Sequence, residues 1–316
     1  MKKIISMLLI LVLGTLMFVS CGDDNTSAEK EYKLAIGVAV EQSGAKVTNT
    51  VAAIVTDADG KIVSCRIDCI DVQASLLEDG TVDATKTYQS KAEQGDAYNM
   101  VTYGGAKAEW YAQAKAVETY VTGKTQDEVK AIALGSDGKP TDAELSASCT
   151  IAINSFTTAI DNAFKSAHKA SFKTDADFTV GVAVKADVSP NAAKAKYVAD
   201  FAASVMAGGK VLASVIDSNQ VDVTITDGSF EKMSYPGTKL EQGDDYNMVA
   251  YGGAKAEWYA QAKTFANASV GKTLDEVKAI ALDNAGKLTD AEFSATCTIA
   301  VSGYKAALEA AIGFAR

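Results

Sequence analysis

Histidine is nearly absent from this chain, since His168 is the single one among 316 residues. A zinc site built from histidines needs more imidazoles than this, and the sequence also contains neither the GxSxG nucleophile motif of many serine hydrolases nor a CxxC pair. These absences argue against a hydrolase and against a metal site built from histidine and cysteine. His168 ends a predicted helix, where a solvated role is expected.

Positive charge is also scarce. The 30 lysine and arginine residues are outnumbered by 40 aspartate and glutamate residues, which gives a formal net charge of −10. Binding to nucleic acid needs a basic surface, so an acidic body predicts no nucleic-acid partner. Charge also does not hold such a body on anionic lipid.

One apolar run, Ile4 to Val19, follows Met1-Lys2-Lys3. It is short for a membrane span, and its basic start is typical of a secretory signal peptide over residues 1–20. The run ends in Phe18-Val19-Ser20-Cys21, which resembles a bacterial lipobox with phenylalanine where leucine is most frequent.

This resemblance implies cleavage before Cys21, acyl chains such as palmitate on Cys21, and a polar tether over residues 21–32. We therefore expect an extracytoplasmic lipoprotein whose membrane partner is reached through the lipid anchor. An ordinary signal peptide followed by an incidental cysteine is the alternative.

The other cysteines are Cys65, Cys69, Cys149 and Cys297. The run around Cys65 and Cys69 predicts a strand, in which four residues span roughly 13 Å, too far for a disulfide. The remaining two occupy equivalent places in a repeat, so a bond between them needs two domains that face each other. Small buried thiols are the expected state.

One stretch of the sequence occurs twice. Residues 93–115 read EQGDAYNMVTYGGAKAEWYAQAK, and residues 241–263 repeat them with two changes. AIGVAVE at 35–41 matches TVGVAVK at 179–185, and DEVKAIAL recurs at 127–134 and 275–282. The period of about 148 residues predicts two complete domains in tandem, over 33–169 and 176–316, joined by a linker at 170–175.

Each copy predicts an α+β domain, a mainly antiparallel sheet followed by a helical second half. Apolar and β-branched runs with a turn at Asp57-Ala58-Asp59-Gly60 indicate the strands, whereas residues 191–206 fit a helix as well as a strand. Four Thr-x-x-Glu capping boxes, from Thr125, Thr141, Thr273 and Thr289, predict helix starts. Apolar residues at helical spacing, from Ile153 to Phe164, predict one long closing helix after Glu144.

The repeated stretch offers a candidate site at its paired glycines. Gly104-Gly105 and Gly252-Gly253 permit close approach of another group, and a helix beginning near Ala106 would present free amides to an anion. In the alternative the glycines only form a tight loop while the following tryptophan and tyrosine pack into the core.

A second candidate lies where Glu144 to Thr150 is matched by Glu292 to Thr298. Small hydroxyl residues cluster here beside a capped helix start, which suits either a phosphate or close packing of helix on sheet.

The order of sheet, glycine loop, tryptophan helix and hydroxyl-rich helix resembles the extracytoplasmic FMN-binding domains of bacterial lipoproteins. That resemblance implies FMN as the cofactor, joined by a phosphoester to the threonine that ends the attachment motif, here Thr150 and Thr298. It implies phosphate contacts from the neighbouring hydroxyls and glycines and shielding by aromatic rings. The implied contacts are Ser148, Thr296, Gly104, Gly105, Gly252, Gly253, Tyr103, Tyr251, Trp110 and Trp258.

Several positions depart from that motif. Glu144 stands where the family has aspartate, Ala147 where it has Ser or Thr, Ser148 where it has glycine and Cys149 where it has alanine. The hypotheses are thus a flavin carrier that passes electrons to a redox partner, and a non-enzymatic lipoprotein that binds a small solute, a peptide or an envelope component.

Overall fold

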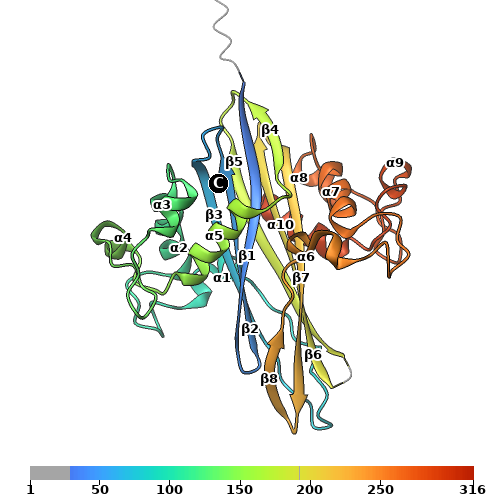
Figure 1. Ribbon diagram of the computed structural model, residues 1–316, viewed down its shortest axis with the longest axis horizontal. Coiled ribbons are helices and arrows are strands. Elements are labelled where there is room, and N and C mark those ends of the chain that lie inside the picture. Colours follow the sequence, from blue (N-terminus) through green and yellow to red (C-terminus); the bar gives the residue numbers. More distant parts are fainter. Residues whose placement is uncertain (1–28, 192) are drawn as a thin grey trace, which may run out of the picture.

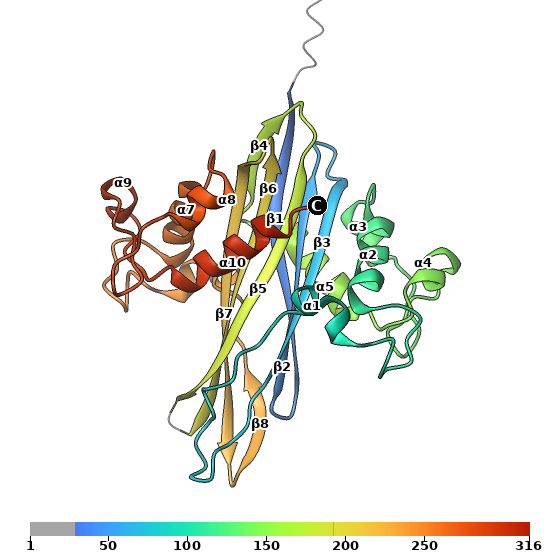
Figure 2. The ribbon, with the colours of Figure 1, turned by 180° about the vertical axis from the view of Figure 1, so that it is seen from behind.

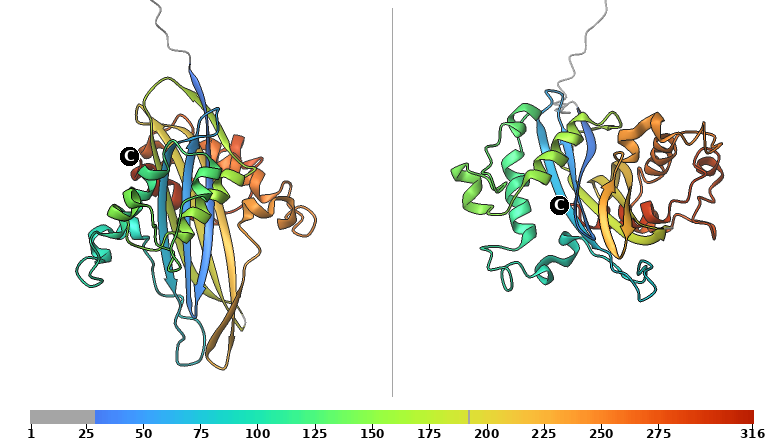
Figure 3. Two further views of the ribbon diagram at one scale, coloured as in Figure 1. Left: turned by 60° about the vertical axis from the view of Figure 1, so that its left-hand side comes forward. Right: turned by 60° about the horizontal axis from the view of Figure 1, so that its bottom comes forward.

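The computed structural model describes residues 29–191 and 193–316, and in these residues two four-stranded antiparallel sheets pack face to face with helices outside both (Figure 1). Figure 3 shows the same layers from further directions. The predicted signal peptide, the lipidation site Cys21 and the start of the tether at 21–32 lie outside the described residues.

The first sheet has the strand order β3-β2-β1-β4. Its strands are β1 (Lys30–Ser43), β2 (Lys46–Thr56), β3 (Ile62–Gln73) and β4 (Ala170–Thr174). Between β3 and β4 come the helices α1 (Lys91–Gln94), η1 (Gly95–Tyr98), α2 (Trp110–Val121), α3 (Gln126–Lys130), α4 (Ala143–Ser148) and α5 (Asn154–Lys165).

The second sheet has the order β5-β6-β7-β8. Its strands are β5 (Thr179–Asn191), β6 (Lys194–Ala207), β7 (Lys210–Thr226) and β8 (Ser229–Ser234). The helices that follow are α6 (Lys239–Gln242), η2 (Gly243–Tyr246), α7 (Trp258–Ala268), α8 (Leu274–Lys278), α9 (Ala291–Ser294) and α10 (Ser302–Gly313). The predicted α+β duplication, a sheet followed by helices in each half, is confirmed.

The structure changes one sequence-based assignment and decides another that the sequence left open. The expected linker 170–175 contains β4, which pairs with the start of β1 from Lys30 opposite Thr174 to Leu34 opposite Ala170. The segment that fits helix or strand becomes β6, because β5 and β7 pair with it on both sides and outweigh its local helical preference.

Helix starts are partly as expected. Thr125 and Thr273 form complete capping boxes with the glutamates three residues on. The boxes expected at Thr141 and Thr289 are wrong, since the neighbouring aspartates are the caps; Asp142 accepts hydrogen bonds from the backbone N–H groups of Glu144 and Leu145. The long closing helix is also wrong, because the chain leaves helical geometry at Cys149 and helix α5 starts afresh at Asn154.

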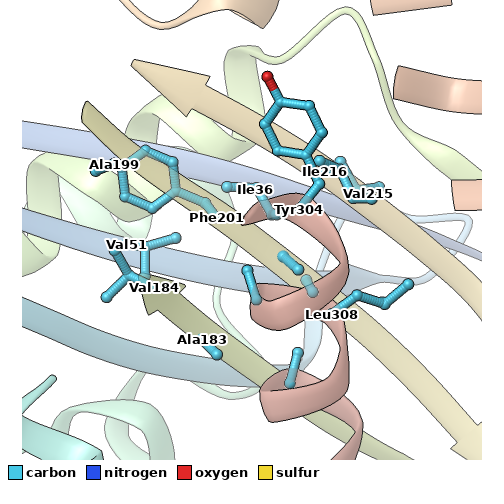
Figure 4. Close-up of a cluster of buried hydrophobic side chains, with 14 of the residues drawn as sticks. Ile36, Val51, Ala183, Val184, Ala199, Phe201, Val215, Ile216, Tyr304 and Leu308 are labelled. Carbon is cyan, nitrogen blue, oxygen red and sulfur yellow. The ribbon is translucent and has the colours of Figure 1, made fainter. Parts of the chain in front are cut away.

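One hydrophobic core joins both halves. Ile36 and Val51 of the first sheet belong to the same buried cluster as Val184 and Phe201 of the second, and the close-up in Figure 4 shows these side chains together. The opposite face of each sheet is covered by helices, as Leu308 of α10 illustrates. Since each sheet is apolar on both faces, neither half can expose its inner face to water without losing this burial.

The long helices α5 and α10 cross their sheets at a glycine, and Figure 2 shows α10 lying over the second sheet. A Cβ placed on Gly37 would lie 2.2 Å from the carbonyl oxygen of Ala159 on α5. On Gly181 it would lie 1.8 Å from the carbonyl oxygen of Ala311 on α10. Both glycines therefore set how closely helix and sheet approach.

We expect Gly37→Ala and Gly181→Ala each to lower the free energy of unfolding by about 3 kcal/mol, because the added methyl group must push a helix backbone off the sheet. Gly313→Ala is the matched control, since a Cβ at Gly313 meets nothing within 4 Å. Urea denaturation measures all three variants. Equal midpoints for Gly37→Ala and Gly313→Ala would contradict this account of the crossing.

Candidate functional site

The repeated stretch forms the entry to a helical lobe on each half. We call residues 91–153 the first lobe and residues 239–301 the second lobe; they lie on opposite flanks of the sandwich (Figures 1 and 2). Within each lobe the stretch runs from the end of the short capped helix, through a 3-10 turn and the paired glycines, into the tryptophan helix. Asn99 and Asn247 both end the 3-10 turn in left-handed geometry, so the loops match in backbone conformation.

The N–H of Ala106, where the anion cradle was expected, donates to the Met100 carbonyl oxygen, and two amides earlier in the loop are also occupied by the protein itself. The Glu109 carboxylate accepts hydrogen bonds from the N–H groups of Met100 at 2.9 Å and Val101 at 3.0 Å. Glu257 does the same in the second lobe. Helix α2 begins at Trp110 with Glu109 as its N-cap residue, so the expected helix start near Ala106 is wrong.

The glycine pair is required by this loop. A Cβ on Gly104 would lie 2.7 Å from the Met100 carbonyl oxygen, and Gly105 has a φ of +62°. Gly252 and Gly253 have the same environment. The paired glycines thus hold a compact loop that its own glutamate closes.

Both tryptophans of the implied flavin site are core residues. Trp110 packs edge-on against Phe156, and Trp258 packs in the same way against Tyr304. Trp110 is 4% exposed and Trp258 is 2% exposed. The indole of Trp258 also donates a hydrogen bond to the Tyr304 hydroxyl at 3.1 Å. Their ring faces pack against protein and are not open to a ligand.

The tyrosines next to the glycines have the opposite environment. Tyr103 is 86% exposed and Tyr251 is 89% exposed, and Val101 and Val249 beside them are each 44% exposed. These side chains add little to the core, although the loop that presents them is fixed by internal hydrogen bonds on both sides. Each of these two loops therefore displays one tyrosine and one valine on a backbone held by internal hydrogen bonds.

The threonines implied as flavin attachment points are tied to the tryptophan helix. The Thr150 amide and hydroxyl both donate to the Gln113 side-chain oxygen, at 2.8 and 3.2 Å. Thr298 makes the same pair of bonds to Gln261.

The residues around these threonines have separate environments. Ser148 and Thr296 are exposed, whereas Cys149 and Cys297 are buried free thiols, as are Cys65 and Cys69. A hollow of about 620 Å³ lies beside Ser148, and Lys115 and Glu144 line it, but Thr150 and Gly104 do not. These residues do not fit the covalent flavin site, because the attaching hydroxyls, the glycine loops and the tryptophan rings face different surroundings.

Sequence reasoning missed a pair of buried carboxyl groups. Asp68 on β3 accepts hydrogen bonds from the N–H groups of Cys69 and Ala92, which attaches helix α1 to the sheet edge. Asp217 on β7 does the same with Ser218 and Leu240. The matched text RIDC and VIDS, an aspartate inside a buried strand of each copy, was the available signal.

Burial dominates the electrostatics of both groups. It raises the pKa of Asp68 and of Asp217 from 3.8 to about 7, against the smaller opposing effect of their hydrogen bonds to Ser90 and Thr238. Each carboxyl therefore binds its proton more tightly in the folded chain than in the unfolded one. In the pH range between the ordinary pKa of the unfolded chain and the raised pKa of the folded chain, the free energy of unfolding must therefore fall as the pH rises.

We expect the protein to be less stable at pH 8 than at pH 5, by roughly 2 to 4 kcal/mol for each of these carboxyl groups. Asp68→Asn should reduce this pH dependence because the amide does not ionise. Thermal unfolding at both pH values measures the effect, and Asp59→Asn, at an exposed turn, is the control. An unchanged pH dependence in Asp68→Asn would show that Asp68 titrates normally.

Comparison with known proteins gives no family for this chain. Among residues 29–191 and 193–316, no helix is both long and apolar enough to cross a membrane. The same residues contain no group of three or more His, Cys, Asp or Glu side chains placed to hold a metal ion. No protein-family model matches the chain, and neither a curated protein nor a solved structure is similar enough to match.

Proposed function

We propose that this protein is a non-enzymatic, membrane-anchored surface lipoprotein that binds its partner through two equivalent loops, residues 101–105 and 249–253. The observation behind the proposal is the exposure of Tyr103 and Tyr251 on loops that are otherwise held rigidly in place. Aromatic side chains on preformed loops are typical of binding surfaces, because they bury a large area at little cost in conformational entropy.

The needs of the fold account for much of the repeated stretch but not for these tyrosines. The glycines fit the tight loop, the glutamate closes it, and the tryptophan fills the core. Tyr111 donates to Asp96 and so fixes the 3-10 turn on the helix. The exposed tyrosine has no such role, and both copies have kept it.

The arrangement of the lobes favours a large or repetitive partner. Because the lobes lie on opposite flanks, the two loops cannot close on one small solute (Figure 1). A polymer, or a surface that presents many copies of one site, can engage both loops. Binding at the second loop is then intramolecular, which can strengthen attachment by about 100-fold or more without a new contact.

FMN-dependent electron transfer, which the family resemblance implies, is the less supported alternative. The hydroxyls of Thr150 and Thr298 are hydrogen-bonded within the protein, and Trp110 and Trp258 are buried. Exposed tyrosines alone do not indicate a flavin.

The proposed anchor is consistent with the end of the sandwich at which β1 begins. Strand β1 begins with Lys30 at one end of the elongated sandwich, and the hairpin of β7 and β8 lies at the other end (Figure 1). A lipid at Cys21 would place the hairpin end away from the membrane and leave both flanks accessible.

We expect the double variant Tyr103→Ser and Tyr251→Ser to lose binding while its unfolding free energy changes by less than about 0.5 kcal/mol. The single variants should each retain weakened, monovalent binding. Polysaccharide and peptide arrays probed with the mature protein supply the readout. Leu77→Ser, which removes an exposed side chain outside both lobes, is the control. Array signals that survive in the double variant would refute the loop assignment.

Intact-mass and absorbance measurements on protein purified from membranes test the anchor and the flavin together. We expect acyl chains on Cys21 and neither a flavin band nor an added flavin mass on Thr150 or Thr298, even in a host with a flavin transferase. Cys21→Ser should move the protein to the soluble fraction. A flavin mass traced to either threonine would favour the electron carrier instead.

A further inference from the structure

The two halves differ at one matched place. This place is the edge of the strand that lies beside the tryptophan helix, which is β3 beside α2 in the first half and β7 beside α7 in the second. In the first half a buried carboxylate closes this edge. Glu118 of α2 accepts a hydrogen bond from the backbone N–H of Ile67 at 3.0 Å. Its second oxygen lies 3.4 Å from Arg66, 3.7 Å from Lys115 and 3.8 Å from Arg316. One carboxylate thus satisfies an edge amide and the positive charges around it.

In the second half that carboxylate is missing. Aligning WYAQAKAVE with WYAQAKTFA places Ala266 at the position of Glu118 and Lys263 at that of Lys115. Aligning RIDC with VIDS places Val215 at the position of Arg66, and the repeat period places His168 at that of Arg316. The lysine is retained, but the carboxylate and both arginines are lost.

A cavity of about 380 Å³ lies where the carboxylate would be. Val215, Ile216 and Ala266 are among the apolar residues that line it. Lys263, Lys169 and His168 add polar groups. The cavity lies between the second lobe and the segment that leads into β4, so both halves contribute to it.

The edge amide points into this space. Ile67 is paired with Ala52 and Ile216 with Ala202 in the same register, so the N–H of Ile216 is directed away from β6 as that of Ile67 is from β2. In the first half this N–H donates to Glu118. Ala266 cannot accept the equivalent bond.

The charge around the cavity suits a single anionic group. Lys263 has lost the partner that Lys115 retains, while Lys169 donates to the Phe164 carbonyl oxygen at the end of α5. The His168 ring packs against Tyr259 at a tilt, with ring centroids 4.6 Å apart. Burial and Lys263 lower the pKa of His168, and the opposing Asp244 does not reverse this effect, so its imidazole is neutral at neutral pH.

We propose that this cavity binds a small molecule with one carboxylate and an apolar or aromatic body. The ligand carboxylate takes the place of the Glu118 carboxylate, accepting hydrogen bonds from the Ile216 N–H and the Lys263 ammonium group. Its apolar body lies against Val215 and Ala266, where the first half has an arginine and a glutamate. This site is separate from the exposed tyrosine loops and does not depend on their function.

Titration calorimetry with phenylacetate and hexanoate tests the proposal, using the soluble Cys21→Ser form of the mature protein. We expect binding of at least one acid and none of phenylacetamide, which has the same body without the charge. Ala266→Glu should abolish binding, because it supplies the missing carboxylate from within, and should leave the thermal midpoint unchanged or higher.

Lys263→Gln should weaken binding at least tenfold, whereas Lys115→Gln, the same change at the matched place in the first half, should leave it unaffected. The proposal is overturned if neither acid binds the parent protein at millimolar concentration. It is equally overturned if Ala266→Glu, folded by circular dichroism, binds as tightly as its parent.

Discussion

Burial of the two inner sheet faces against each other is the constraint on which the rest of the structure depends. The cluster that contains Val51, Val184 and Phe201 belongs to neither half alone. Because the outer faces are covered by α5 and α10, each sheet is buried on both sides, and its central strands are apolar in both directions. The lobes are consequences of this arrangement, since they extend from sheet edges that the sandwich has already fixed. The two copies of the duplicated chain thus share one core, and neither copy provides that core alone.

Within that unit the two copies have changed in different ways. The loops that hold Tyr103 and Tyr251 have the same hydrogen bonds, backbone angles and exposure. At the strand edges the copies differ, with a buried carboxylate among positive charges in the first and a cavity with a single retained lysine in the second. The copies therefore present one surface twice and one interior site once. A sandwich made from a duplicated domain can acquire different functions in this way without altering the core that both halves share.

The repeat and the α+β character were predictable because both depend on local sequence, namely a long identity and the apolar spacing of strands. The capping boxes at Thr125 and Thr273 followed from local chemistry as well. Face-to-face packing of the sheets was not predictable, since it involves side chains far apart in the chain. For the same reason the sequence indicated a linker where β4 forms, and it did not decide between helix and strand for β6. In the candidate site, the sequence located the glycine loop, but only the geometry showed that Glu109 already fills it. Whether a tryptophan faces a ligand or the core depends on such distant contacts, and so does the cavity beside Ala266, although the sequence itself shows that the carboxylate is missing there.

The pairing of β4 with β1 has a mechanical consequence. Strand β1 is an interior strand, bonded to β2 along its length and to β4 over its first residues. Under the proposed anchoring, a pull between the membrane and a partner held at the lobes enters the sandwich at Lys30 and acts along β1. Force in that direction shears the ladders, so that many hydrogen bonds share the load, instead of opening them one at a time. The short strand between the two repeats thus reinforces the point at which the tether meets the fold.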